Sequence, residues 1–179
     1  METPTAAGGW KLDSQCNYLL LLARCLVPIQ ERGQFDPADI VQITLLQAHE
    51  RLDQFRGQTE EALRAWLRTI LRNTLALERR RVLPRVSPQA LEESSNRLEE
   101  MLAADQSTPS QRLIREEQLL RLADALAQLP EDQRRVVQLY HLDGHARAEV
   151  CRLTGKTYAE VNGLLIRGLR KLRGLIEPL

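Results

Sequence analysis

The tetrapeptide Thr154-Gly155-Lys156-Thr157 ends in Gly-Lys-Thr, the sequence that closes a phosphate-binding P-loop. A P-loop also needs a first glycine five residues before the second one, and a buried strand before the loop. Val150 occupies that first position, and the preceding segment "ARAEVCRL" has a helical pattern. The chain also lacks an apolar strand pattern ending in an acid. The sequence therefore argues against a nucleotide site, and Gly155 must have another role.

A helix-turn-helix is the alternative for this stretch. Residues 146–153 form its short first helix, and Gly155 stands where the chain must turn sharply, a position at which a positive φ favours glycine. Thr157 is placed to cap the second helix, and Glu160 completes a capping box. In a DNA-binding helix-turn-helix, the second helix lies in the major groove with its N-terminal residues at the base edges.

The helix after Thr157 has one apolar side and one cationic side. The apolar arc contains Val161, Leu164, Leu165, Gly168 and Leu172, and the opposite side contains Arg167, Arg170 and Lys171. A cationic face suits DNA phosphates. A solvated amphipathic helix with ordinary surface arginines has the same pattern, and this stretch alone leaves both interpretations open.

A second basic segment is "TEEALRAWLRTILRNTLALERRR", residues 59–81. Arginines recur along it, with Arg64, Arg68 and Arg72 on one side of a helix and Arg79, Arg80 and Arg81 at its end. Arginines bind phosphates, and Trp66 and Asn73 can stack on or hydrogen-bond to an unpaired base. The alternative is that Trp66 belongs to the core and that the arginines are solvated.

Helices must position both segments, because aromatic residues make up only 4% of the chain and β-branched residues are sparse. We predict an all-α protein with a disordered lead-in at 1–9 and helical domains at 10–81 and 111–179. Helix starts are expected at Asp36 and Thr59, and Pro130 is expected in the first turn of a later helix. Residues 82–110 are rich in proline, serine and acids, which predicts an acidic linker with a helical turn or two around 91–101.

Nothing in the sequence indicates catalysis, a metal site or a cofactor. Cys16, Cys25 and Cys151 form no C-x-x-C pair and have no zinc-type spacing with histidine, which predicts thiols in a reducing compartment. No Ser/His/Asp set or pair of carboxylates is evident, so we expect a non-catalytic protein. The apolar run "NYLLLLARCLVP" is short and contains Arg24, which predicts a core helix and a cytoplasmic protein without a membrane segment.

Two segments resemble conserved regions of bacterial extracytoplasmic-function sigma factors. Residues 35–81, with "DPADIVQITLLQA" and "AWLRTILRN", resemble the second region, and residues 122–177 resemble the fourth. The stretch 91–133 is similar to versions found in planctomycete-type genomes. The resemblance implies two small helical domains, of sigma region 2 and region 4 type. It also implies that the protein joins core RNA polymerase and directs promoter recognition, DNA melting and transcription initiation.

The resemblance further implies which residues make the contacts. The β′ clamp helices of the polymerase are bound by Asp39, Gln42, Leu45 and Leu46. The minus-ten element is captured and melted by Arg64, Trp66, Arg68, Asn73, Arg79 and Arg80. The minus-thirty-five element is read by Lys156, Thr157, Tyr158, Asn162, Arg167, Arg170 and Lys171. The β flap of the polymerase and, as an optional inhibitor, an anti-sigma factor are the other implied partners.

The chain departs from the family at several positions. The unusual residues are Leu77, His145, Ala146, Arg147, Thr154 and Asn162. The family usually has Asp at position 77, Ser at 146, Lys at 162, and Leu at 145, 147 and 154. These departures keep two alternatives in view: a helix-turn-helix regulator with a sigma-like fold that lacks initiation activity, and a protein-binding adaptor.

Overall fold

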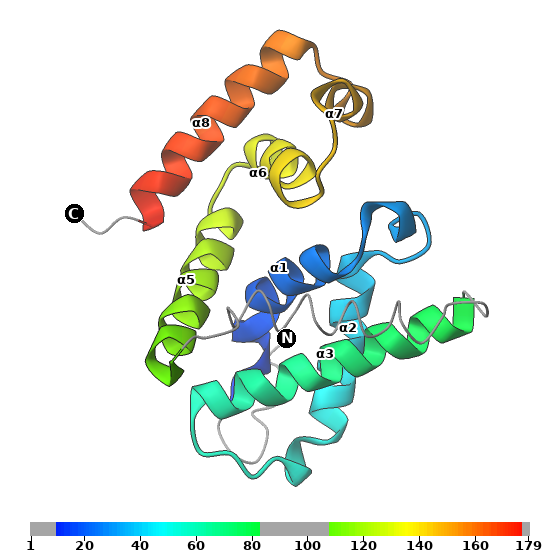
Figure 1. Ribbon diagram of the computed structural model, residues 1–179, viewed down its shortest axis with the longest axis vertical. Coiled ribbons are helices and arrows are strands. Elements are labelled where there is room, and N and C mark those ends of the chain that lie inside the picture. Colours follow the sequence, from blue (N-terminus) through cyan, green and yellow to red (C-terminus); the bar gives the residue numbers. More distant parts are fainter. Residues whose placement is uncertain (1–9, 83–107, 177–179) are drawn as a thin grey trace, which may run out of the picture. The chain divides into compact units, whose positions relative to one another are not determined.

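The computed structural model describes residues 10–82 and 108–176, and no residue in these two ranges forms a strand. The described helices divide into two compact units, the first with α1, α2 and α3 and the second with α5 to α8 (Figure 1). The prediction of an all-α protein with two helical domains is confirmed. The predicted lead-in, most of the predicted linker and the predicted turns around 91–101 lie outside the described residues.

The N-terminal unit packs α1, α2 and α3 around a leucine-rich core. Its elements are η1 (Leu12–Gln15), α1 (Cys16–Leu26), α2 (Pro37–Glu50), η3 (Leu52–Gln54) and α3 (Glu60–Val82), and the short η2 (Ile29–Glu31) stands between α1 and α2 in the chain. Leu22, Leu63 and Leu67 are fully buried, and each such side chain stabilises the fold by about 1.5–3 kcal/mol. Both predicted helix starts are confirmed, because Asp36 accepts the Ala38 N–H at 2.8 Å and Thr59 Oγ1 accepts the Ala62 N–H at 3.2 Å.

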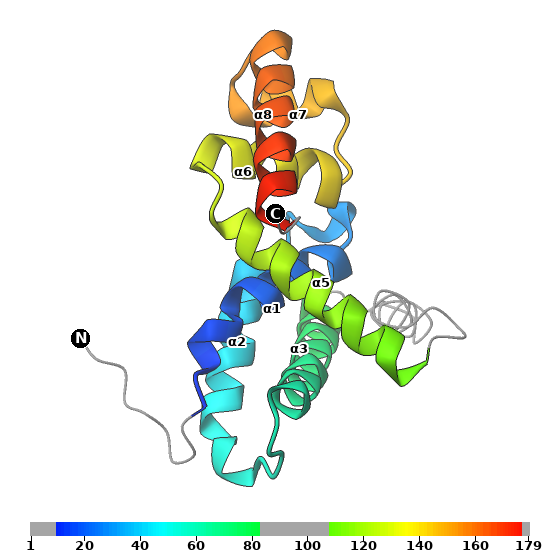
Figure 2. The same cartoon turned by 90° about the vertical axis from the view of Figure 1, so that its left-hand side faces the viewer.

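The C-terminal unit packs α8 against the three helices before it (Figures 1 and 2). Its elements are α5 (Pro109–Ala127), α6 (Glu131–Val137), the π-helical turn η4 (Gln138–Leu142), α7 (Arg147–Thr154) and α8 (Tyr158–Ile176). Val136, Val150 and Val161 are fully buried and form the centre of this core.

Two predicted boundaries in this unit are shifted by helix caps. α5 begins at Pro109, two residues before the expected domain start, because Thr108 and Gln111 form a capping box. The sequence interpretation assigns this stretch to the linker because of its composition, and it therefore does not predict the capping box. Pro130 is the N-cap of α6 and does not lie in its first turn, and Glu131 and Asp132 follow it at the positive end of the helix dipole.

Gly168 lets α8 approach α6 closely. A Cβ at Gly168 would lie 2.8 Å from Val137 Cγ2 and 3.5 Å from Gln133 Cβ. We therefore expect Gly168→Leu to lower the free energy of unfolding by about 1–3 kcal/mol through overpacking. Gly174→Ala is the matched control, because no atom lies within 4 Å of its Cβ position and alanine favours the helix by roughly 1 kcal/mol. Urea unfolding followed by circular dichroism measures both, and equal stability of the two variants would contradict close packing at Gly168.

Candidate functional site

The Gly-Lys-Thr stretch forms the turn between α7 and α8. Gly155 adopts the left-handed conformation, with φ +67°, and the Lys156 N–H returns to the Cys151 carbonyl at 3.2 Å. The backbone N–H and the hydroxyl of Thr157 both donate to Glu160 Oε2 at 2.7 Å, and the Glu160 N–H donates back to Thr157 Oγ1. The hydrogen bond from the Thr157 hydroxyl, followed by that from its backbone N–H, lowers the pKa of the Glu160 carboxyl. The predicted helix-turn-helix and capping box are confirmed.

The two sides of α8 separate as the sequence predicts. The buried side contains Val161, Leu165, Gly168 and Leu172, with Leu164 half-buried at its edge. Arg167, Arg170 and Lys171 are exposed. Ile166, which the sequence interpretation does not include, is 59% exposed and lies one turn before Arg170. The outward face of α8 is therefore cationic, with the exposed apolar side chains of Ile166 and Leu169 among the cations.

Some residues predicted to read the minus-thirty-five element have partners within the chain. Lys156 Nζ lies 3.2 Å from Asp132 Oδ1 on α6, and the Thr157 hydroxyl is engaged in the capping box. Asn162 is half-buried, whereas Tyr158 is 55% exposed. The structure thus brings Tyr158, Arg167, Arg170 and Lys171 to the surface of one helix, while Lys156 and Thr157 also make contacts within the chain, and the predicted DNA contacts of both stay predictions.

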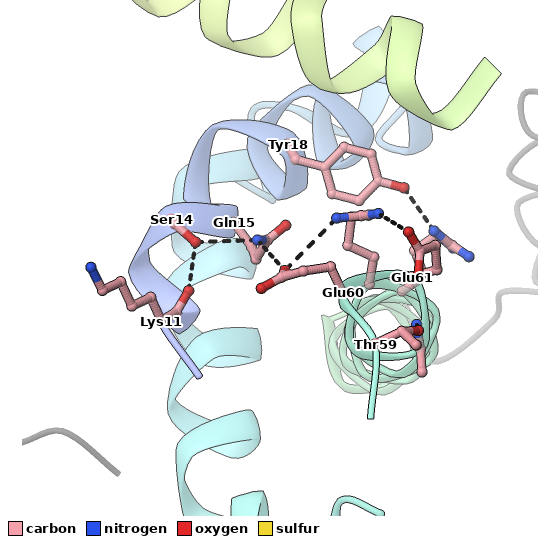
Figure 3. A network of polar contacts seen from close by, with 10 residues as sticks. Lys11, Ser14, Gln15, Tyr18, Thr59, Glu60 and Glu61 are labelled. Atoms are coloured by element: carbon pink, nitrogen blue, oxygen red, sulfur yellow. Dashed lines mark hydrogen bonds and ion pairs between the residues drawn. The ribbon is translucent and has the colours of Figure 1, made fainter. Parts of the chain in front are cut away.

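On the arginine side of α3, Arg64 is buried and Arg68 and Arg72 are half-buried. Arg64 is 8% exposed and lies within 4 Å of Glu60 and Glu61, and Glu60 also accepts a hydrogen bond from Gln15 (Figure 3). Arg68 Nη1 donates to the Tyr18 hydroxyl at 2.9 Å. Acids in the first turn of α3 therefore hold the Arg64 guanidinium, and its contact with the minus-ten element stays a prediction.

Arg79 is the most deeply buried cation among the described residues, with 2% of its surface exposed. Its Nε donates to Glu31 Oε2 at 2.8 Å, and Nη2 donates to the Leu26 carbonyl at 3.1 Å. The predicted contact of Arg79 with the minus-ten element stays a prediction, while in this structure its guanidinium is held inside the chain. Arg79 thereby ties the end of α3 to the segment after α1.

The opposite face of α3 is the exposed one. Asn73 and Arg80, both predicted to bind the minus-ten element, lie on it together with Thr69 and with Leu77, which is 63% exposed. Beside this face the half-buried Trp66 packs on Phe55, with ring centroids 5.1 Å apart, and Phe55 contacts Trp10 edge-to-face. Sequence reasoning missed Phe55, because nothing in its local pattern places it against a helix that begins five residues later.

Gly57 makes room for the Phe55 ring. A Cβ at Gly57 would lie 2.3 Å from the ring and 2.8 Å from Ala62 Cβ. We expect Gly57→Ala to displace Phe55 from Trp66 and to cost about 1–3 kcal/mol of stability. A red shift of Trp66 fluorescence in a Trp10→Phe background measures the displacement. Gly33→Ala is the control, since its Cβ position is open, and an unchanged spectrum in Gly57→Ala would contradict the expected role.

An exposed stripe on α2 carries the residues expected to bind polymerase. We call Asp39, Gln42, Leu46 and His49 the α2 stripe; all four are exposed and recur at helical spacing. Leu46 is 61% exposed, and Leu45 lies half-buried on the flank of the stripe. His49 was not among the residues predicted to bind polymerase, and the structure places it on the same exposed stripe. The opposite side of α2 packs into the core through Ile40, Val41 and Ala48.

The described ranges 10–82 and 108–176 show no cluster of three or more His, Cys, Asp or Glu side chains placed to hold a metal ion. In the same ranges no helix has the length and hydropathy needed to cross a bilayer. Cys16 is an exposed thiol, and Cys25 and Cys151 are half-buried thiols.

Comparison with known proteins identifies the family. Residues 18–82 match Sigma-70 region 2, and residues 119–172 match Sigma-70 region 4. The chain is 33% identical over 141 residues to the ECF RNA polymerase sigma factor SigL of Mycobacterium tuberculosis, covering 79% of this chain and 75% of that protein. It is 29% identical over 152 residues to the ECF RNA polymerase sigma-E factor of Escherichia coli, covering 80% and 75%.

A solved structure of the sigma factor RpoE with the anti-sigma factor NepR from Bartonella quintana matches over 92% of each chain, at 23% identity and a TM-score of 0.34. The two Sigma-70 matches coincide with the two structural units, since one ends with α3 and the other spans α6, α7 and most of α8. The two Sigma-70 matches and the 33% identical relative show that this chain belongs to the extracytoplasmic-function sigma factors, which bind core RNA polymerase and direct it to promoters.

Proposed function

We propose that this sigma factor divides its task among three helix faces. The α2 stripe docks on the β′ clamp helices, the exposed face of α3 holds the minus-ten element, and the outward face of α8 reads the minus-thirty-five element. The observation that carries the proposal is the form of α8, a helix with a buried apolar side, a capped N-terminus and an exposed cationic face. Such a helix is suited to the major groove.

At the minus-ten element, we propose that binding energy drives melting. Flipping a base costs a few kcal/mol, and stacking on an aromatic side chain returns about 1–3 kcal/mol per base. Trp66, supported from behind by Phe55, provides the stacking surface, while Asn73 hydrogen-bonds a base and Arg80 binds the backbone phosphates. Arg64 and Arg79 support this surface from inside the unit, through their internal ion pairs.

At the minus-thirty-five element, cations and base-reading side chains divide the work. Arg167, Arg170 and Lys171 contact phosphates, which sets the register and the salt dependence of binding. Tyr158 and Asn162 lie near the N-terminus of α8, where a recognition helix meets base edges. Ile166 is placed for apolar contact with a thymine methyl group.

The remaining predictions concern partners and setting. The acidic linker at 82–110 suits passage through a basic polymerase channel, the C-terminal unit contacts the β flap, and an anti-sigma factor remains an optional partner. We propose that the chain is non-catalytic and acts in the cytoplasm, where core polymerase works. The planctomycete-type assignment rests on the stretch 91–133 alone and stays a prediction.

Run-off transcription with cognate core polymerase on a genomic library tests the proposal, followed by alignment of the start sites. We expect transcripts whose upstream sequences share a minus-ten and a minus-thirty-five element at fixed spacing. Absence of transcripts with an active core enzyme would contradict it. Specific duplex binding by the free chain without transcription would instead identify a helix-turn-helix regulator.

A further inference from the structure

Arg147 joins three elements of the helix-turn-helix. It is the first residue of α7, and its guanidinium carbon lies 5.3 Å from the ring centroid of Tyr140 in η4 and 6.0 Å from that of Tyr158 at the start of α8. Nη1 donates to the Tyr158 hydroxyl at 3.4 Å. A planar cation between two aromatic rings is a cation–π arrangement that arginine forms better than lysine.

This contact fixes how the Tyr158 hydroxyl can be used. A phenol oxygen that accepts a hydrogen bond from a guanidinium cannot point its own hydrogen at that donor, since arginine has no acceptor. The phenol hydrogen must therefore point away from Arg147. Because Tyr158 is 55% exposed at the first position of α8, this hydrogen is available to an acceptor outside the chain, at the end of the helix where a recognition helix meets base edges.

We propose that Arg147 is a positioning residue that presents the Tyr158 hydroxyl as a hydrogen-bond donor to an acceptor on promoter DNA. This inference rests on the proposed reading of the minus-thirty-five element by α8. The acceptor is a purine N7, a carbonyl oxygen on a base edge, or a phosphate oxygen, and all three share the same chemistry. Arg147 acts through Tyr158 and does not itself contact the DNA.

The alternative role for Arg147 is a direct phosphate contact, and salt dependence separates the two roles. A cation on a phosphate contributes about one unit to the slope of log affinity against log salt concentration, whereas a neutral tyrosine donor contributes almost none. If Arg147 acts through Tyr158, then Arg147→Met lowers promoter affinity but leaves this slope nearly unchanged.

The test uses holoenzyme assembled from the full chain and core polymerase, on a promoter library randomised in the minus-thirty-five element. The variants are Tyr158→Phe, Arg147→Met, Arg147→Lys and the double variant Arg147→Met/Tyr158→Phe. Arg152→Met is the matched control on α7, because Arg152 is exposed and paired with Glu149. Thermal unfolding of every variant is recorded first. Tyr158→Phe removes only the hydroxyl group of an exposed side chain, so its promoter affinity tests the proposal even if an Arg147 variant unfolds.

We expect Tyr158→Phe and Arg147→Met each to weaken promoter binding by about 3- to 10-fold, as for one hydrogen bond. The promoter affinity of the double variant should be no lower than that of the single variant with the lower affinity, since both changes remove the same contact. Arg147→Lys should resemble Arg147→Met, and Arg152→Met should resemble the wild type. Loss of preference at one position indicates a base acceptor, and a uniform loss over all sequences indicates a phosphate acceptor; either outcome supports the proposal.

Wild-type affinity of Tyr158→Phe would overturn the proposal, as would additive effects in the double variant. A fall of about one unit in the salt slope for Arg147→Met would overturn it in favour of a direct phosphate contact. If the wild-type holoenzyme selects no minus-thirty-five sequence, the proposed function itself fails. The measurement on the wild type distinguishes this outcome from a failure of the Arg147 proposal.

Discussion

Arg79→Met is expected to lower the free energy of unfolding of the N-terminal unit by about 3–5 kcal/mol. Methionine keeps much of the side-chain length but removes the cation that pairs with Glu31 and donates to the Leu26 carbonyl. The Glu31 side chain is only 24% exposed, so water replaces the lost partner incompletely. Removing one member of a buried ion pair costs more than the pair contributes, because the other charge stays behind without compensation.

Tryptophan fluorescence in a urea titration measures this loss specifically. Both tryptophans, Trp10 and Trp66, lie in the N-terminal unit, so the signal reports on that unit alone. Arg81→Met is the matched control, because the Arg81 side chain is 78% exposed and its ion pair with Glu78 should contribute less than about 1 kcal/mol. Equal midpoints for the two variants would show that the buried arginine does not stabilise the unit.

The helices and the turn of the reading site are predictable because their signals are local. Asp36, Thr59 and Thr157 cap helices through atoms two or three residues away, so each cap is legible in a few letters of sequence. The buried side of α8 follows from the 3.6-residue period of its apolar residues alone. Gly155 is predictable because the turn requires a positive φ.

The roles of the α3 arginines are not predictable in the same way, because the position of a charge on a helical wheel does not reveal its partner. Arg79 pairs with Glu31, which is 48 residues away in the chain, and Arg68 bonds to Tyr18, 50 residues away. Sequence reasoning assigns such cations to the surface, where arginines usually lie. Phe55 is missed for the same reason, since only the folded chain brings it against Trp66. The residues that remain on the exposed face of α3 are fewer and less basic than the sequence suggests.

Leu46→Asp is expected to weaken binding to core RNA polymerase by about 30-fold or more, the loss typical of a hot-spot residue. Leu46 is 61% exposed and stands within the α2 stripe, flanked by the polar side chains of Gln42 and His49. A large apolar residue within a polar surface is the arrangement found at the centre of protein interfaces, where water is excluded on binding. An aspartate there would have to be desolvated without a partner.

Because Leu46 is exposed, its replacement should leave the fold intact, and this separates a docking defect from unfolding. Val82→Asp is the matched control, since Val82 is an exposed apolar residue at the end of α3, in the same unit as Leu46 but outside the α2 stripe. Competition with a labelled wild-type chain for core polymerase measures the affinity of both variants, and thermal unfolding verifies that each is folded.

If Leu46→Asp competes as well as the wild type, the α2 stripe is not the docking surface. If Val82→Asp weakens binding equally, then an acid at any exposed apolar position of this unit weakens binding, and the effect does not locate the interface. Loss for Leu46→Asp alone would assign polymerase docking to the α2 stripe, because only that variant changes its one large apolar residue.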